Sequence, residues 1–151
     1  MGNMDWKVSA LGFGAMRLPI KKKDDKDIIN EEEAIKMIRY AIDHGVNYVD
    51  TAWPYHGGKS EIILGKALKD GYREKVKVAD KLPHWLCSSQ EDMDYFLQKQ
   101  LERLDDREID YYLVHSLDHQ SWINAKKNGI ISFMDGAKKS GKIKNMGFSF
   151  H

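Results

Sequence analysis

Four side chains of types that move protons recur along the chain: Asp50, Tyr55, Lys81 and His115. Free tyrosine is a weak acid near neutral pH, and a nearby ammonium would stabilise its phenolate, so Lys81 would make Tyr55 a better proton donor. Asp50 could hold Lys81 in place, and His115 could donate a hydrogen bond to a carbonyl oxygen that gains negative charge. The set suits protonation of an alkoxide. Because no side chain supplies hydride, the matching reduction would require a nicotinamide cofactor.

Each of these residues also has a purely structural interpretation. Asp50 could cap loop amides at a strand end, and Tyr55 could pack beside Trp53. Lys81 alone is typical of a protein surface, and His115 of a hydrogen-bonded histidine under a loop. Residue type alone leaves both interpretations open. The position of these residues at successive strand ends favours the chemical one.

Short apolar strands alternate with amphipathic helices along the whole chain. The expected strands cover residues 8–14, 46–50, 75–81, 109–115 and 142–148, and the expected helices cover 30–45, 60–70, 88–104, 122–128 and 130–140. Asn30 with Glu33 predicts a capping box for the first helix, Ser88 or Ser89 caps the third, and residues 18–27 are expected to form a loop. Strands joined by crossover helices are parallel, so either an open doubly wound sheet or part of a (β/α) barrel fits. In both, the loops after the strands carry the ligand site.

Length and composition predict one ordinary soluble domain over residues 1–151. Hydrophobic residues make up 42% and charged residues 31%, with a formal net charge of +1. This balance gives no support for nucleic acid or a membrane as partner. No apolar run reaches transmembrane length and no signal pattern opens the chain, so a cytoplasmic location is expected. Cys87 is the single cysteine, expected to be a partly exposed bystander, which excludes a disulfide framework, a thiolate metal site and a cysteine-held iron–sulfur cluster.

Several short motifs together resemble the aldo/keto reductase family, in order and in spacing. They are LGFGAMRLP at 11–19, DTAWPY at 50–55, KLP at 81–83, HSLD at 115–118 and GFS at 147–149. The resemblance runs from about residue 8 to 151. It implies NADP(H) or NAD(H) as cofactor and reduction of aldehydes and ketones. The stretch YHGG at 55–58 and the closing GFSFH resemble the branch with a C-terminal 4Fe-4S ferredoxin-like domain, which would be absent here.

The resemblance also implies a role for each matching residue. Tyr55 would be the general acid, Lys81 and Asp50 would tune it, and His115 would orient the carbonyl. The residues expected against the cofactor are Gly14, Ala15, Met16, Arg17, Asp50 and Ser149. Trp53 and Trp85 would wall the substrate pocket, although core packing is equally possible for either. Asp80 stands where the family usually has a small hydroxyl residue, and a charge on that helix-facing side would be costly unless paired.

The family fold is a TIM-type (β/α)8 barrel of about 250 residues. The 151 residues here are expected to form half of it, about (βα)4 plus a fifth strand. The grip on the adenosine phosphates would then be incomplete, and cofactor binding weak. An open apolar face and two strand edges predict a homodimer or higher homo-oligomer that covers the open half barrel, either by joining strand edges or by swapping helices across the sheet.

Two other functions stay open on the sequence. One is a catalytically inactive half-barrel remnant or self-assembling module that keeps the site residues without turnover. The other is an open-sheet nucleotide or phosphate binder, which rests on Gly12 and Gly14 alone, because Arg17 stands where a GxGxxG motif has its third glycine.

Overall fold

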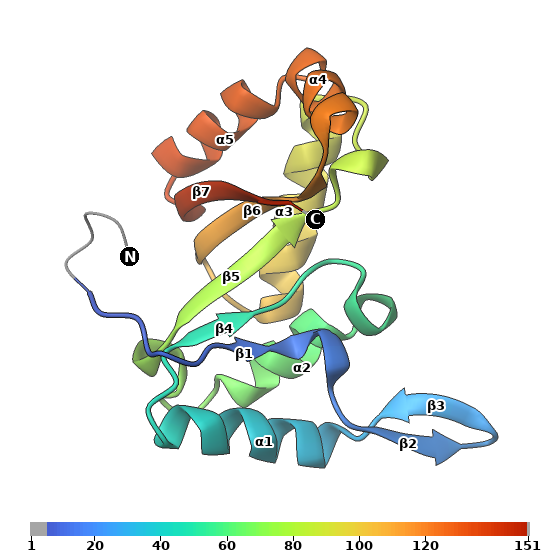
Figure 1. Cartoon of the computed structure of the whole chain (residues 1–151), viewed down its shortest axis with the longest axis vertical. Helices are drawn as coiled ribbons and strands as arrows, with labels where there is room; N and C mark the ends of the chain where they lie inside the picture. Colours follow the sequence, from blue (N-terminus) through green and yellow to red (C-terminus); the bar gives the residue numbers. More distant parts are fainter. Residues whose placement is uncertain (1–5, 151) are drawn as a thin grey trace.

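Five parallel strands form the main sheet of this protein, in the order β1-β4-β5-β6-β7 (Figure 1). The computed structural model describes residues 6–150. The strands are β1 (Phe13–Gly14), β4 (Tyr48–Asp50), β5 (Lys77–Leu82), β6 (Ile109–Leu117) and β7 (Ile143–Phe150). The expected α/β class, with parallel strands in chain order, is confirmed. Of the predicted domain 1–151, residues 1–5 and His151 lie outside the described residues.

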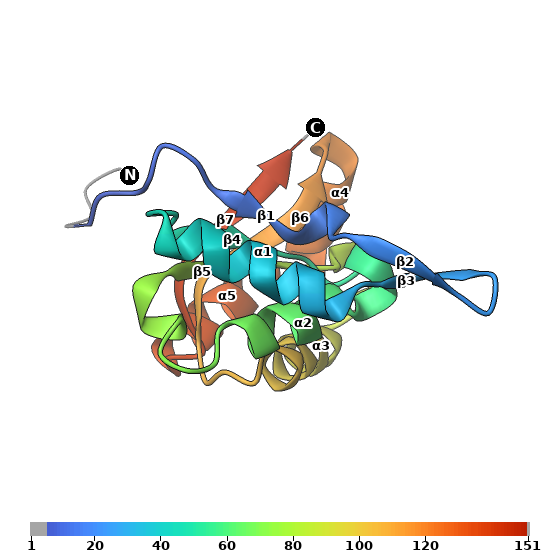
Figure 2. The ribbon, with the colours of Figure 1, turned by 90° about the horizontal axis from the view of Figure 1, so that it is seen from below.

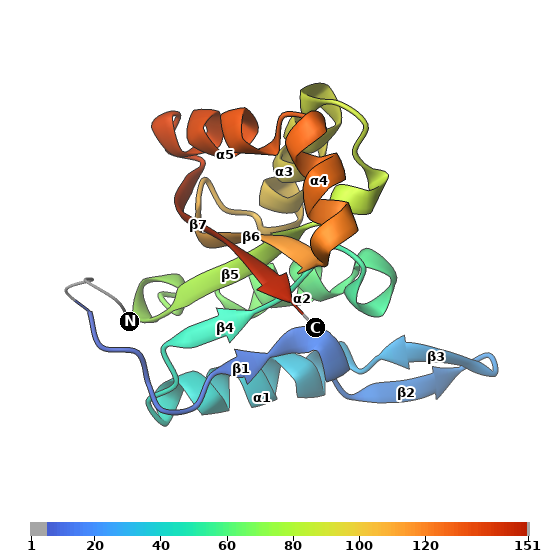
Figure 3. The same cartoon turned by 45° about the horizontal axis from the view of Figure 1, so that its top comes forward.

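Crossover helices connect the strands and cover one side of the sheet. They are α1 (Glu31–Asp43), α2 (Ser60–Ala67), α3 (Gln90–Leu104), α4 (His119–Lys127) and α5 (Ile130–Lys139). Figure 3 shows the strands running in order from β7 to β1, and Figure 2 shows α1, α2 and α3 on one side of them. Apolar side chains between the two layers form the core, among them Ile38, Val49, Leu64, Val78, Leu82, Met93, Leu97 and Tyr112.

The other side of the sheet carries aromatic residues near the start of its strands. The Trp6 Nε1 donates to the Tyr111 hydroxyl at 2.8 Å. The Tyr48 and Tyr111 ring centroids lie 5.5 Å apart. These rings pack together at the amino-terminal end of the strands, opposite the end that carries Asp50, Lys81 and His115.

A β-hairpin stands where residues 18–27 were expected to form a loop. Its strands β2 (Ile20–Lys23) and β3 (Lys26–Ile29) pair antiparallel and project from the domain (Figure 1). Asp24 and Asp25 form its turn with φ of 48° and 58°, a left-handed conformation that aspartate tolerates in two-residue hairpins. The charges that suggested a loop are compatible with a ribbon in which β2 is exposed throughout and β3 is half-buried only at Ile28 and Ile29, and Lys22 pairs with Asp27 at 3.0 Å.

The helix starts match the sequence at one of two predicted caps. Ser89 accepts the Asp92 amide, and the Asp92 side chain bonds back to the Ser89 amide, a full capping box. The box predicted at Asn30 is wrong, because that side chain makes no cap hydrogen bond. The Asn30 backbone amide instead donates to Pro19 O at 2.8 Å, which fastens the helix start to the hairpin.

Cys87 is buried, not partly exposed as expected. Burial raises the pKa of its thiol to about 12, so it is not a ready nucleophile. Within residues 6–150 no group of three or more His, Cys, Asp and Glu side chains could hold a metal ion. In the same part of the chain no helix is both long and apolar enough to span a bilayer.

Candidate functional site

The Lys81 ammonium is the centre of the candidate site. It lies near the carboxyl end of β5, 6% exposed. Its Nζ donates to Asp50 Oδ1 at 2.6 Å and to the Thr51 carbonyl at 2.8 Å. It also lies 3.3 Å from the Tyr55 hydroxyl oxygen, which accepts its third hydrogen bond. Because that oxygen accepts from Lys81, Tyr55 keeps its own O–H to donate elsewhere.

Parallel pairing explains why these residues meet. Asp50 is in register with Ala79, so β4 ends two residues before Lys81 on the neighbouring strand. The chain then leaves the sheet and turns back at Tyr55–Gly58, where His56 has a φ of 53°. The His56 Nε2 accepts the Leu18 amide at 2.9 Å, which joins this turn to the segment after β1. The turn brings the Tyr55 hydroxyl back over the end of β5.

His115 lies beside Tyr55 from the next strand, β6. Its ring centroid is 5.9 Å from that of Tyr55, edge to face, and the side chain is buried. Trp85, about half exposed in the turn His84–Leu86, has its ring 5.4 Å from His115. The structure therefore brings Asp50, Tyr55, Lys81 and His115 to one edge of the sheet, with Trp85 beside them.

Trp53 lies in a different environment from Trp85. The Arg103 guanidinium stacks over its ring at 3.5 Å, and Phe96 contacts it edge to face at 4.8 Å. Both partners belong to α3. These contacts are typical of a residue that packs in the core, which is one of the two roles expected for Trp53 from the sequence. The other role, a wall of the substrate pocket, stays a prediction.

The residues expected against a cofactor lie on the same rim. Gly14 is in register with Asp50, and a Cβ at Gly14 would meet no atom within 4 Å. The short turn Ala15–Arg17 follows, with Ala15 buried and the next two side chains exposed. On the far side, the Ser149 hydroxyl accepts the Ser116 amide at 2.7 Å. Gly14 on β1 and Ser149 on β7 thus stand at opposite ends of the rim formed by the carboxyl ends of the strands.

Sequence reasoning missed two members of this site, Thr51 and His56. Thr51 contributes its backbone carbonyl, which any residue type has. His56 acts through a left-handed turn and a ring nitrogen that reaches another segment. The adjacent pair Gly57-Gly58 signals a tight turn, but neither the acceptor role nor its partner can be read from residue types.

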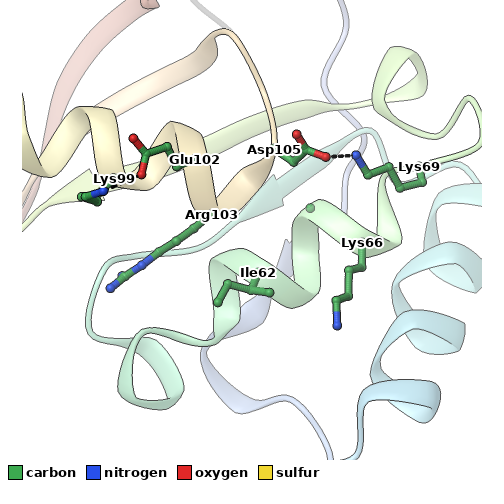
Figure 4. A pocket seen from close by; sticks show the side chains of 8 residues that line it. Ile62, Lys66, Lys69, Lys99, Glu102, Arg103 and Asp105 are labelled. Atoms are coloured by element: carbon green, nitrogen blue, oxygen red, sulfur yellow. Dashed lines mark hydrogen bonds and ion pairs between the residues drawn. The ribbon is translucent and has the colours of Figure 1, made fainter.

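A separate hollow of about 460 Å³ lies between α2 and α3 (Figure 4). It is lined by Ile62, Gly65, Lys66, Lys69, Lys99, Glu102, Arg103 and Asp105. Its charges are largely paired, since Lys69 contacts Asp105 and Lys99 lies 2.7 Å from Glu102. None of its lining residues is a predicted site residue.

Known proteins that are similar to this chain are aldo/keto reductases. A model of the aldo/keto reductase family matches residues 10–151. A Glycine max protein named probable aldo-keto reductase 1 is 31% identical over 157 residues, covering 99% of this chain and 43% of the relative. An aldo-keto reductase of Gibberella moniliformis is 30% identical, covering 96% of this chain and 44% of the relative.

Solved structures of the same kind share the fold. The holo form of an aldo-keto reductase from Bacillus halodurans has a TM-score of 0.82 and 29% identity, with 99% of this chain and 48% of that chain covered. An aldo/keto reductase from Klebsiella pneumoniae, solved with NADP and acetate, has a TM-score of 0.75 and 25% identity, with 93% and 45% covered. This chain spans less than half the length of each of these relatives. With its family match over nearly the whole length, the chain belongs to the aldo/keto reductase family.

Proposed function

We propose that this chain carries the proton-transfer side of an NAD(P)H-dependent reductase of small aldehydes and ketones. The observation that supports this most is the contact of one buried ammonium, Lys81 Nζ, with both Asp50 and Tyr55. A lysine held at a tyrosine oxygen is suited to proton donation from that oxygen.

In the proposed reaction the carbonyl oxygen lies between Tyr55 and His115. The Tyr55 hydroxyl gives its proton to that oxygen, and the ammonium 3.3 Å away stabilises the phenolate left behind. Asp50, 2.6 Å from Lys81, keeps this cation charged and oriented. The His115 ring, beside Tyr55, donates a hydrogen bond that orients the carbonyl.

The rim between Gly14 and Ser149 fits the nicotinamide end of a cofactor. The open space at Gly14 accommodates a flat ring, and the Ser149 hydroxyl keeps a proton to donate to a carboxamide oxygen. Met16 and Arg17 are exposed beside Gly14, where they can cover the ring and meet a phosphate. When bound, the nicotinamide supplies the hydride to the carbonyl carbon. The Klebsiella pneumoniae structure with NADP supports this choice of cofactor.

Nicotinamide fluorescence during titration with this chain tests cofactor binding. We expect saturable binding well above micromolar NADPH, because the residues here face only the nicotinamide end. Ser149→Ala should weaken it about 2- to 10-fold, the worth of one hydrogen bond. Ser140 follows α5 at the opposite end of the sheet, where its hydroxyl donates to Ala137 O, so Ser140→Ala is a matched loss of one hydroxyl that should leave affinity unchanged. No fluorescence change up to millimolar NADPH would contradict the cofactor assignment.

We also propose that the chain associates with itself through a row of exposed side chains on the edge strand β7, namely Met146, Phe148 and Phe150. Phe148 and Val114 are register partners, and so face the same side, yet Phe148 is 65% exposed and Val114 only 4%. Met146 and Phe150 continue the exposed row. Such a row on an edge strand favours association. It equally supports the second candidate, a self-assembling module without turnover. Tyr55→Phe separates the two, because an enzyme loses turnover in this variant while a module without turnover changes nothing.

A further inference from the structure

The pairing of β4 with β5 is interrupted at Lys81. Up to that point the ladder is regular: the Lys77 amide donates to Asn47 O at 2.8 Å, and the Thr51 amide donates to Ala79 O at 2.9 Å. In a parallel ladder the next bond would join the Lys81 amide to the Thr51 carbonyl. That carbonyl instead accepts the Lys81 Nζ at 2.8 Å. The side chain of Lys81 therefore occupies the acceptor that its own amide would take.

Two buried side chains satisfy the Lys81 peptide groups in place of the ladder. The Lys81 amide donates to Asp80 Oδ1 at 2.7 Å. The Gln100 Nε2, from α3, donates to the Lys81 carbonyl at 3.1 Å. Buried backbone groups left without such partners would cost free energy, so these two bonds make the departure of β4 from the sheet tolerable.

The bonds continue into a network centred on Glu61 of α2. Its two oxygens accept Gln100 Nε2 at 2.9 Å and Arg103 at 2.8 Å. The Tyr112 hydroxyl donates to Gln100 Oε1 at 2.6 Å. Figure 4 shows Arg103 extending from α3 over the start of α2. Glu61 is fully buried, and Arg103 balances its charge.

The second oxygen of Asp80 requires a proton. Asp80 Oδ2 is buried and accepts no hydrogen bond from any donor within residues 6–150. It faces the Glu61 carboxyl, and two carboxyls attract each other only when one carries a proton. Burial first, and then the charge of Glu61, raise the pKa of Asp80 well above its usual range. Since Glu61 already holds Arg103 and Gln100, the proton belongs on Asp80.

The charged and titratable groups around Asp80 come from every element packed on it. They are Glu61 on α2, to which Arg103 of α3 is paired, Lys81 on β5, and Tyr112 on β6, which Cys87 and Asp94 also influence electrostatically. Burial raises the pKa of Tyr112 well above its usual value, so that phenol stays neutral. Lys81 opposes the shift at Asp80 without offsetting the burial.

We propose that Asp80 is a protonated positioning residue for Lys81: one oxygen donates to Glu61, the other accepts the Lys81 amide, and the Thr51 carbonyl is thereby left to the ammonium. This inference rests on the proposed function, because Lys81 matters as the cation beside Tyr55. Its test needs neither cofactor nor carbonyl substrate, so its failure can be told from failure of the reductase proposal.

Urea unfolding of the wild type and Asp80→Asn at pH 5 to 9 tests the proton. Asparagine keeps an acceptor for the Lys81 amide and a donor for Glu61 but cannot ionise. A carboxyl whose pKa is raised on folding stabilises the protein below its unfolded pKa, and this stability is lost as pH rises toward the folded value. As pH rises through this window, the ratio of the wild-type unfolding equilibrium constant to that of Asp80→Asn should therefore increase by up to tenfold per pH unit. Parallel pH curves would overturn the proposal.

Nitrogen-15 NMR of Lys81 tests the positioning. In Asp80→Asn the Lys81 amide shift and the slow exchange of its ammonium protons should match the wild type. In Asp80→Leu, which has no acceptor, the amide shift should move and ammonium exchange should accelerate. Unchanged Lys81 signals in a folded Asp80→Leu variant would show that Asp80 does not position Lys81. If Asp80→Leu does not fold, a changed Lys81 signal in Asp80→Asn would overturn the proposal and an unchanged one would support it.

Discussion

Gly65 of α2 lies directly against the Leu104 carbonyl at the end of α3. A Cβ at Gly65 would stand 2.4 Å from that oxygen, closer than any real Cβ contact. Four residues earlier in each helix, Glu61 meets Gln100 through a hydrogen bond of 2.9 Å. Since residues four apart share a helix face, the missing side chain at Gly65 sets the helix spacing at which Glu61 reaches α3.

Gly65→Ala should destabilise the chain by about 1–3 kcal/mol, because the new methyl group forces the two helices apart. Gly136→Ala is the matched control. Gly136 lies in α5, and a Cβ there meets no atom within 4 Å, so alanine should stabilise by about 0.5–1 kcal/mol through helix propensity. Urea unfolding of both variants measures the difference. Equal stability of the two variants would contradict the close approach.

Asp110 should contribute stability that is lost in acid. Its side chain is 1% exposed and lies 2.8 Å from Arg73 and 3.2 Å from Lys77. Burial alone would raise the pKa of this carboxyl, but the Val78 amide and the two cations outweigh it and lower that pKa. A lowered folded pKa means that the stability is present above the unfolded value, about 4, and disappears as pH falls below it.

Asp110→Asn should therefore cost about 2–3 kcal/mol at pH 7, with the gap to wild type closing below about pH 4. Unfolding free energies over pH 2.5 to 7 measure this gap. Asp27→Asn, which breaks an exposed pair with Lys22 on the hairpin, should change stability by less than about 1 kcal/mol at any pH. A constant gap for Asp110→Asn down to pH 2.5 would count against the assigned charge.

Self-association should depend on the exposed row of β7. Phe148→Ser combined with Phe150→Ser removes both large side chains and should weaken association at least tenfold, seen as a lower mass in light scattering. Tyr95→Ser removes a similarly exposed aromatic residue from α3 and should leave the mass unchanged. A wild-type chain that stays folded at the mass of one copy would rule out the proposed association.

Periodicity and strand-end placement predict most of the fold from sequence. Alternation along 109–115 and the helical spacing of 88–104 mark elements whose type depends on local apolar pattern, and both form. The hairpin at 20–29 is missed because its charged residues carry no apolar alternation, and its turn depends on two left-handed aspartates. A pattern of apolar residues predicts only elements that pack against the core, and most residues of this hairpin are exposed to solvent.

The site is predictable only in part, for a related reason. Asp50, Lys81 and His115 stand at strand ends, so parallel pairing alone brings them to one edge. Trp53 cannot be placed in the same way, because its contact with Arg103 depends on how the loop after β4 folds. The proton on Asp80 needs the position of Glu61, 19 residues earlier in sequence and on another element.

Turnover in the full chain tests the central claim most directly. NADPH oxidation is followed at 340 nm with a small aldehyde, comparing the wild type with Tyr55→Phe, which removes one hydroxyl and keeps the ring. The account predicts carbonyl-dependent NADPH oxidation by the wild type. In the variant kcat should fall by about 10²-fold or more, which is the rate enhancement that a general acid usually contributes. Equal rates for the two proteins, or no turnover by a wild type that binds NADPH, would contradict it.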